Sequence, residues 1–352
     1  MQRLHAMDSA RAALLTLGVL FHSMVFVYLY QPPKSAEEFL FIVFAHQFLH
    51  AFRMPAFFII AGFFAAYLLA GRGAAGLIKN RLARIFAPLV IFWLPITFAN
   101  SWTSQGSWIS DRNTFDILPV DFQHLWFLYF LMIFSLILAA VPNRMLTAIS
   151  KATRPAIALV VVALATPLLP GVLDAEVTLA TSSRLIPDPG LLAFYLILFL
   201  TGAIIFHQRD TWLVFLSDKA VPMSLVFLIA FTIFFFTQDT GAATVPFVYG
   251  LAVSLGSFGA IGIFLRFFSR SNKVTRFVSD SSYWMYLVHL PLVFFFLVSF
   301  ARLELGALPT VLLTTVLTIT ISLVSYKLLV RSTLLGKLLN GKTRPFFRKS
   351  GS

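Results

Sequence analysis

Long apolar runs bounded by polar or charged residues repeat along the whole chain. A helix of about 17–25 apolar residues is long enough to cross the hydrocarbon core of a bilayer. The pattern predicts about ten such helices, with approximate bounds Ala10–Tyr30, Phe39–Ala70, Ile85–Asn100, Gln123–Val141, Ala156–Leu173, Leu191–His207, Val221–Thr237, Ala243–Leu265, Ser282–Phe300 and Ala307–Leu329. The strict alternation of β-strands is absent, so the chain is predicted to be an all-α, polytopic integral membrane protein.

Two of these runs differ from a simple span. The run over Phe39–Ala70 is too long for one straight crossing and contains Pro55 and Gly62, so we expect it to tilt, kink or continue past the bilayer. The run over Val221–Thr237 is the weakest, because the apolar stretch Trp212–Leu216 extends it on the other side of Pro222. The spans predict one transmembrane domain over residues 1–330 and a basic tail over residues 331–352.

Composition agrees with a membrane protein and excludes several other classes. Of the 352 residues, 59% are hydrophobic and 12% are charged, against about 45–50% and about 25% in soluble domains. An ordinary soluble enzyme, a disordered chain and a fibrous repeat are therefore excluded. The chain has no cysteine, which excludes disulfides, thiolate metal sites and a cysteine acyl-enzyme. We expect no metal site and no bound cofactor.

The net charge of +13 has a topological explanation. If the N-terminus is cytoplasmic and the loops alternate, 22 of the 27 Lys and Arg residues fall on the cytoplasmic side, four fall outside, and Arg53 lies within a span. This asymmetry is the positive-inside pattern, and it predicts that both termini are cytoplasmic. It also accounts for the basic charge without nucleic acid as a partner; the lipid bilayer is the expected one.

Ionisable residues at membrane depth are costly and are functional candidates by default. Arg11 and His22 are almost three helical turns apart, so they share one face of the first span and lie about 16 Å apart along its axis. Arg11 is then at the cytoplasmic mouth, with Asp8 one turn earlier to orient it, and His22 is near mid-membrane. The alternative is that His22 only bonds a neighbouring helix.

The second span carries three basic residues on one face. His46, His50 and Arg53 are separated by four and three residues, and the last two reach a depth similar to that of His22. A guanidinium at this depth needs an anion, and the spans offer no Asp or Glu for it, which favours an anionic ligand or backbone carbonyl groups. The alternative for Arg53 is snorkelling towards the interface. For His46, a structural role and a peripheral site role are equally open.

Two further groups are candidates for the ends of the site. Arg81 and Arg84 are one turn apart at a cytoplasmic helix entrance and suit phosphate oxygens, although positive-inside bias alone also places arginines there. On the outer side, His124 and Trp126 are candidates for acceptor binding or for lining a cavity, the alternative being an aromatic belt. His289, two residues before Pro291, is expected to line the same cavity or to act as a structural hydrogen bonder.

Taken in order, these motifs resemble the membrane acyltransferase-3 family over nearly the whole chain. The resemblance is carried by Arg11-x10-His22, by Phe57-Phe-Ile-Ile-Ala-Gly-Phe63, by Arg81-x-x-Arg84 and by Ser282-Tyr-x-x-Tyr-Leu-x-His289. Phe48–Met54 and His124–Leu128 look like a narrower branch that succinylates osmoregulated periplasmic glucans. The glutamate usual in the wider family after its Leu-Trp-Ser-Leu motif is missing, since Leu128-Tyr129-Phe130 stands there.

The resemblance implies an O-acyltransferase of the bacterial inner membrane that moves a succinyl or acetyl group from cytoplasmic acyl-CoA to hydroxyls of a periplasmic glucan or polysaccharide. Arg11, Arg81 and Arg84 would hold the CoA phosphates, and His22 would act as general base. His50 would assist proton transfer or polarise the thioester carbonyl. Arg53 would stabilise the oxyanion or bind a succinyl carboxylate.

A different function is compatible with the same residues. A proton-coupled secondary transporter or flippase would also use an intramembrane cluster of His and Arg. The lack of an internal repeat and of intramembrane carboxylates argues against it. A scaffold of a glucan-export complex is a third possibility, and it predicts no effect from changes at His22 or Arg53.

Overall fold

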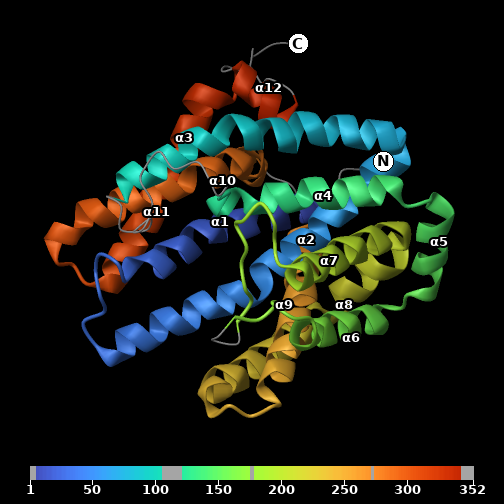
Figure 1. The fold of residues 1–352 in the computed structure, drawn as a ribbon, viewed down its shortest axis with the longest axis horizontal. Coiled ribbons are helices and arrows are strands. Elements are labelled where there is room, and N and C mark those ends of the chain that lie inside the picture. The colour runs from blue at the N-terminus through green and yellow to red at the C-terminus, as the bar shows by residue number, and fades with distance from the viewer. Residues whose placement is uncertain (1–4, 105–120, 175–177, 271–272, 342–352) are drawn as a thin grey trace.

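The structure is a computed structural model that describes the chain apart from residues 1–4, 105–120, 175–177, 271–272 and 342–352. The described residues form helices and no β-strand, only two isolated backbone bridges. The α-helices are α1 (His5–Val27), α2 (Ala36–Arg81), α3 (Ala87–Thr103), α4 (Trp126–Ala140), α5 (Asn143–Ala152), α6 (Pro155–Leu168), α7 (Pro189–His207), α8 (Arg209–Thr237), α9 (Val245–Phe267), α10 (Lys273–Phe300), α11 (Ala307–Ser325) and α12 (Leu334–Asn340) (Figure 1).

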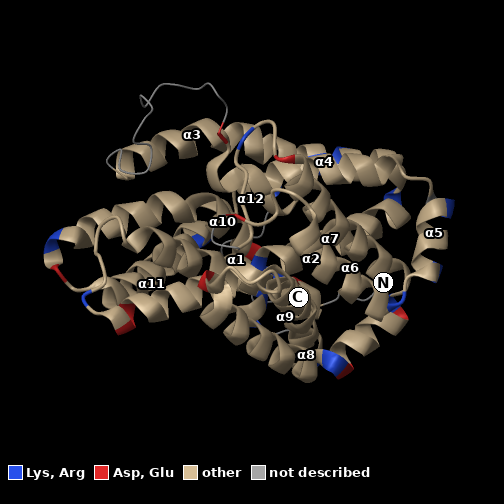
Figure 2. Ribbon diagram, turned by 60° about the horizontal axis from the view of Figure 1, so that its bottom comes forward, with Lys and Arg blue, Asp and Glu red and all other residues tan. Residues whose placement is uncertain are grey.

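The expected all-α, polytopic membrane architecture is confirmed. Among the described residues, eight helical stretches are long and apolar enough to cross a membrane, or nine if α5 and α6, which are bent by 95° against each other, count as one. Charged residues lie mostly at the ends of the helices and leave long uncharged stretches between them (Figure 2). The number of ten crossings, the cytoplasmic placement of both termini and the domain bounds stay predictions.

The second apolar stretch departs most from a simple span. It runs over Ala36–Thr103, and its 68 residues would make a straight helix of about 100 Å, three times the thickness of a bilayer core. The helix breaks at Gly73, whose φ of 68° is adopted readily only by glycine. The chain turns back there, so that α3 runs roughly opposite to α2 (Figure 1). The non-helical residue within α2 is thus Gly73, and not Pro55 or Gly62.

The fifth predicted span, Ala156–Leu173, is wrong at its end. Helix α6 stops at Leu168, one residue after Pro167. Beyond this end, the Ala180 N–H donates to the Val172 carbonyl (2.8 Å). The extension of the seventh run is confirmed, because α8 begins at Arg209 and passes through Pro222. The expected tail over residues 331–352 contains α12, which packs back on the bundle.

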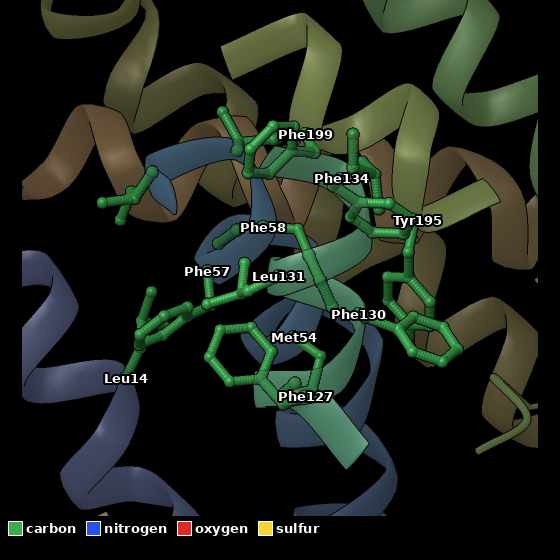
Figure 3. Close-up of a cluster of buried hydrophobic side chains, with 14 of the residues drawn as sticks. Leu14, Met54, Phe57, Phe58, Phe127, Phe130, Leu131, Phe134, Tyr195 and Phe199 are labelled. Carbon is green, nitrogen blue, oxygen red and sulfur yellow. The ribbon is translucent and has the colours of Figure 1, made fainter. Parts of the chain in front are cut away.

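Helices α2, α4 and α7 form an aromatic core (Figure 3). Phe58 of α2 is fully buried, and its ring centroid lies 4.5 Å from that of Tyr195 of α7. Two glycines let these helices approach closely, since Gly62 faces the backbone of Phe199 and Gly202 faces the backbone of Ile59. The contact fixes α2 against α7, and α2 in turn packs on α1.

Candidate active site

The centre of the candidate site is a pair of histidines from the first and tenth helices. His22 of α1 and His289 of α10 are joined by a hydrogen bond of 3.0 Å between His22 Nδ1 and His289 Nε2. Each ring is also held by a backbone carbonyl of its own helix, His22 Nδ1 by Gly18 (2.8 Å) and His289 Nδ1 by Tyr286 (2.7 Å). The two helices pack along each other, which brings residues 267 positions apart into contact.

The two carbonyl groups determine which ring nitrogens carry protons. A carbonyl oxygen only accepts, so His22 Nδ1 and His289 Nδ1 must both be N–H donors. Neutral His289 then has a lone pair on Nε2, which accepts from the same His22 Nδ1–H. Both hydrogen bonds of His22 therefore use Nδ1, and its Nε2 carries the lone pair. The Gly18 carbonyl and His289 Nε2 both accept from His22 Nδ1–H and so fix the ring. His22 Nε2, with its lone pair, is then the nitrogen that can act as a base.

His124 joins this pair from a third helix. Its ring centroid lies 5.0 Å from that of His289, and its Nε2–H donates to the Leu287 carbonyl (3.3 Å). The Tyr286 hydroxyl donates in return to the His124 carbonyl (2.7 Å). His22, His124 and His289 thus form one histidine cluster, and the role of His124 in acceptor binding or cavity lining stays a prediction.

The turn before α4 positions His124. Gln123 has a positive φ of 50°, which is uncommon outside glycine, and its backbone N–H donates to the Asp121 carboxylate (2.7 Å). The Gln123 side chain accepts a hydrogen bond from Asn100 of α3. Trp126, two residues after His124, does not share its face and packs in the aromatic core, 5.4 Å from Tyr195. Trp126 thus lies in the core and not beside the histidines.

A second group of basic residues lies against α1 next to the cluster. The ring of Phe21 stacks on His50, with centroids 5.1 Å apart. The Arg53 guanidinium lies over the same Phe21 ring, 4.7 Å from its centroid. Arg53 also reaches Gly18, where a Cβ atom would lie 2.8 Å from Nη1. His46 is more distant, with a ring centroid 6.0 Å from Phe21.

The loop between α6 and α7 reaches into this group through its backbone. His50 Nε2–H donates to the Leu179 carbonyl (2.6 Å), and the Leu179 N–H donates to the Tyr249 hydroxyl of α9 (3.3 Å). Leu179 is therefore clamped between α2 and α9. His50 Nδ1 keeps its lone pair and is buried without a hydrogen bond. No signal in the sequence indicates this contact, because a carbonyl group is common to all residue types.

The three arginines expected at the phosphate end also lie near one another. Arg11 forms the expected ion pair with Asp8 (3.3 Å), and Arg81 interacts repulsively with both Arg11 and Arg84. The Arg84 carbonyl accepts from the Tyr283 hydroxyl (2.8 Å), which ties this end of the chain to α10. Mutual repulsion among these arginines favours a polyanion between them.

Candidate metal ligands are not arranged as a centre. Among the residues that the structure describes, no group of three or more His, Asp or Glu side chains has a metal-binding arrangement. The ring nitrogens of the histidine cluster instead form hydrogen bonds with backbone carbonyl groups or with each other. The geometry thus suits proton transfer.

Comparisons with known proteins point to one family. A family model for an acyltransferase domain matches residues 4–327. Glucans biosynthesis protein C of Salmonella gallinarum is 28% identical over 331 residues, covering 84% of this chain and 83% of that protein. The protein of the same name from Escherichia coli K12 is 25% identical over 326 residues, with the same coverage. No solved structure matches the chain significantly.

Proposed function

Because the chain belongs to the acyltransferase family, whose domain covers residues 4–327, we propose that this membrane O-acyltransferase transfers succinyl from cytoplasmic succinyl-CoA to hydroxyls of a periplasmic glucan. The observation that carries the proposal is the His22–His289 pair, which leaves one basic nitrogen at the meeting point of α1 and α10. The names of the relatives support the glucan acceptor. The proposal places the protein in the bacterial inner membrane.

In the proposed reaction, His22 Nε2 removes the proton of a sugar hydroxyl as its oxygen attacks the thioester carbonyl carbon. A C–O bond forms, the carbonyl oxygen becomes an oxyanion, and the C–S bond then breaks. His22 returns the proton to the CoA sulfur, so the charges balance. The chain has no cysteine to carry the acyl group, which favours direct transfer or an acyl-histidine over a thiol relay.

Other residues support this step. The His22 imidazolium that forms during attack keeps its Nδ1–H bonded to Gly18 and His289, which spreads the positive charge. His50 and Arg53 lie beside Phe21, where His50 serves the thioester and Arg53 serves the far end of the acyl chain. Arg11, Arg81 and Arg84 bind the CoA phosphates on the cytoplasmic side, with fork-shaped donors that match phosphate oxygens.

Mass analysis of periplasmic glucans from cells with and without the gene tests the proposal. We expect glucans from expressing cells to be heavier by one succinyl unit per modified hydroxyl, while their total amount is unchanged. A change in amount without a mass increment would support transport instead. An acetyl increment would retain the acyltransferase and overturn the choice of donor.

His289 is expected to act as a positioning residue for His22. His289→Leu removes the acceptor of the Nδ1–H, and we expect kcat to fall about 10- to 100-fold with little change in KM for the acyl donor. His289→Gln offers an amide oxygen to the same N–H and should recover part of that loss. Steady-state kinetics of the three proteins check this. If Leu and Gln were equally slow, the hydrogen bond would not be the cause.

A further inference from the structure

Arg53 is a buried cation for which the described part of the chain offers no acceptor. Its side chain is only 7% exposed, and its Nε–H has no hydrogen-bond partner. The Arg53 guanidinium lies over the Phe21 ring and in front of Gly18, neither of which is an anion. Burying a charge without a partner is costly, so the burial of this guanidinium indicates an anionic ligand that binds beside it.

A second donor in the same state comes from α7. The Tyr195 ring is fully buried, and its hydroxyl makes no hydrogen bond with the described residues. The ring is fixed in the aromatic core by Phe58 and Trp126, whose centroids lie 4.5 and 5.4 Å away, so the position of the hydroxyl is fixed too. The Tyr195 side chain lies within electrostatic range of the Arg53 guanidinium.

The Arg53 guanidinium and the Tyr195 hydroxyl are not hydrogen-bonded to each other. A phenol oxygen is a good acceptor for a guanidinium N–H, yet neither group is hydrogen-bonded. Tyr286, the other phenol near Arg53, already donates to the His124 carbonyl. A positive fork and a neutral O–H donor, both lacking an acceptor, match the two oxygens of a carboxylate. A neutral carbonyl would leave the charge of Arg53 uncompensated.

We propose that Arg53 and Tyr195 hold the terminal carboxylate of a dicarboxylic acyl group and thereby select the acyl donor. The inference rests on the proposed function, because it assigns the far end of the transferred chain. Arg53 contacts Gly18, which is one helical turn, about 6 Å along α1, from His22. A four-carbon chain spans such an interval. The alternative partner for Arg53 is the oxyanion of the reaction. An oxyanion forms only transiently, so the guanidinium would stay unpaired while the acyl donor is bound but has not yet reacted.

The test compares two donors that differ only in this charge. The full-length protein in detergent is assayed with succinyl-CoA and with its neutral amide analogue, succinamoyl-CoA, on a purified glucan. We expect wild-type kcat/KM to favour the carboxylate donor. Arg53→Gln and Tyr195→Phe should each lower the succinyl-CoA value about 10- to 100-fold and leave the amide donor within about twofold of wild type.

A matched control removes a similar hydroxyl elsewhere. Tyr28→Phe deletes another buried, unpartnered phenol hydroxyl, in the turn just after α1, and it should leave the donor preference unchanged. Tyr195→Phe keeps the ring and its packing, so thermal unfolding of the free protein should match wild type. Arg53→Gln removes an uncompensated charge and should not lower that stability.

The outcomes separate the inference from the proposed function. If both variants slow the two donors equally, or if wild type uses both donors equally well, the carboxylate site is refuted while the acyltransferase stands. If Tyr195→Phe retains the full donor preference, Tyr195 is not part of the site. If wild type transfers from neither donor, the proposed donor class itself fails.

Discussion

Replacing His22 by Gln is expected to lower the rate of acyl transfer about 10²- to 10⁴-fold, the range attributed to a general base. The Gln amide can still donate to Gly18 and His289, so the packing of α1 against α10 is kept, but it cannot take a proton from the acceptor hydroxyl. Transfer of radiolabelled succinyl from CoA to glucan, measured with purified protein, checks the loss.

The control for this substitution is His207→Gln. His207 ends α7, away from the histidine cluster, and is only partly buried, so its replacement should leave the rate unchanged. If His22→Gln retained more than half of the wild-type rate, the base would have to be another group, and the oriented Nε2 would have no catalytic meaning.

Gly62→Ala is expected to destabilise the fold by about 3 kcal/mol. A Cβ atom at Gly62 would run into the carbonyl of Phe199, a backbone group that cannot rotate away, so α2 and α7 would have to separate. Separation would open the aromatic core around Phe58 and Tyr195. The midpoint of thermal unfolding in detergent should fall by about 5 °C, with a lower yield of monodisperse protein.

Gly71 of the same helix offers a matched comparison. A Cβ atom there meets nothing within 4 Å, so Gly71→Ala changes helix propensity in the same way without a clash. It should be neutral or slightly stabilising. Equal unfolding midpoints for the two alanine variants would mean that the contact between α2 and α7 yields easily, contrary to the close approach described above.

Local spacing predicted the parts of the site that lie on one helix. His50 and Arg53 are three residues apart, share a face and meet the same Phe21 ring, because side chains at this spacing always do. The same rule placed Asp8 beside Arg11. The pairing of His22 with His289 joins helices from opposite ends of the chain, so their motifs suggested both residues as candidates but not their contact.

Other parts of the site carry no readable signal. Tyr195 sits in an apolar helix among aromatic neighbours in a chain with 40 phenylalanines, so its unpartnered hydroxyl is visible only in three dimensions. Trp126 was a candidate for acceptor binding or cavity lining together with His124, two residues earlier, but its ring packs in the aromatic core. The break at Gly73, in contrast, falls between the predicted spans that end at Ala70 and begin at Ile85, so the apolar pattern did indicate where the chain turns back.

The Leu179 carbonyl gives the loop between α6 and α7 an unusual evolutionary constraint. Loops between helices usually tolerate insertions and deletions, because their backbone faces water. This one delivers the backbone of a single residue, Leu179, with its carbonyl to His50 and its N–H to Tyr249. Successive carbonyls of an extended segment point in opposite directions, so one residue inserted just before Leu179 would turn the carbonyl away. Among homologues that keep His50, the length of this loop should therefore be more conserved than its sequence.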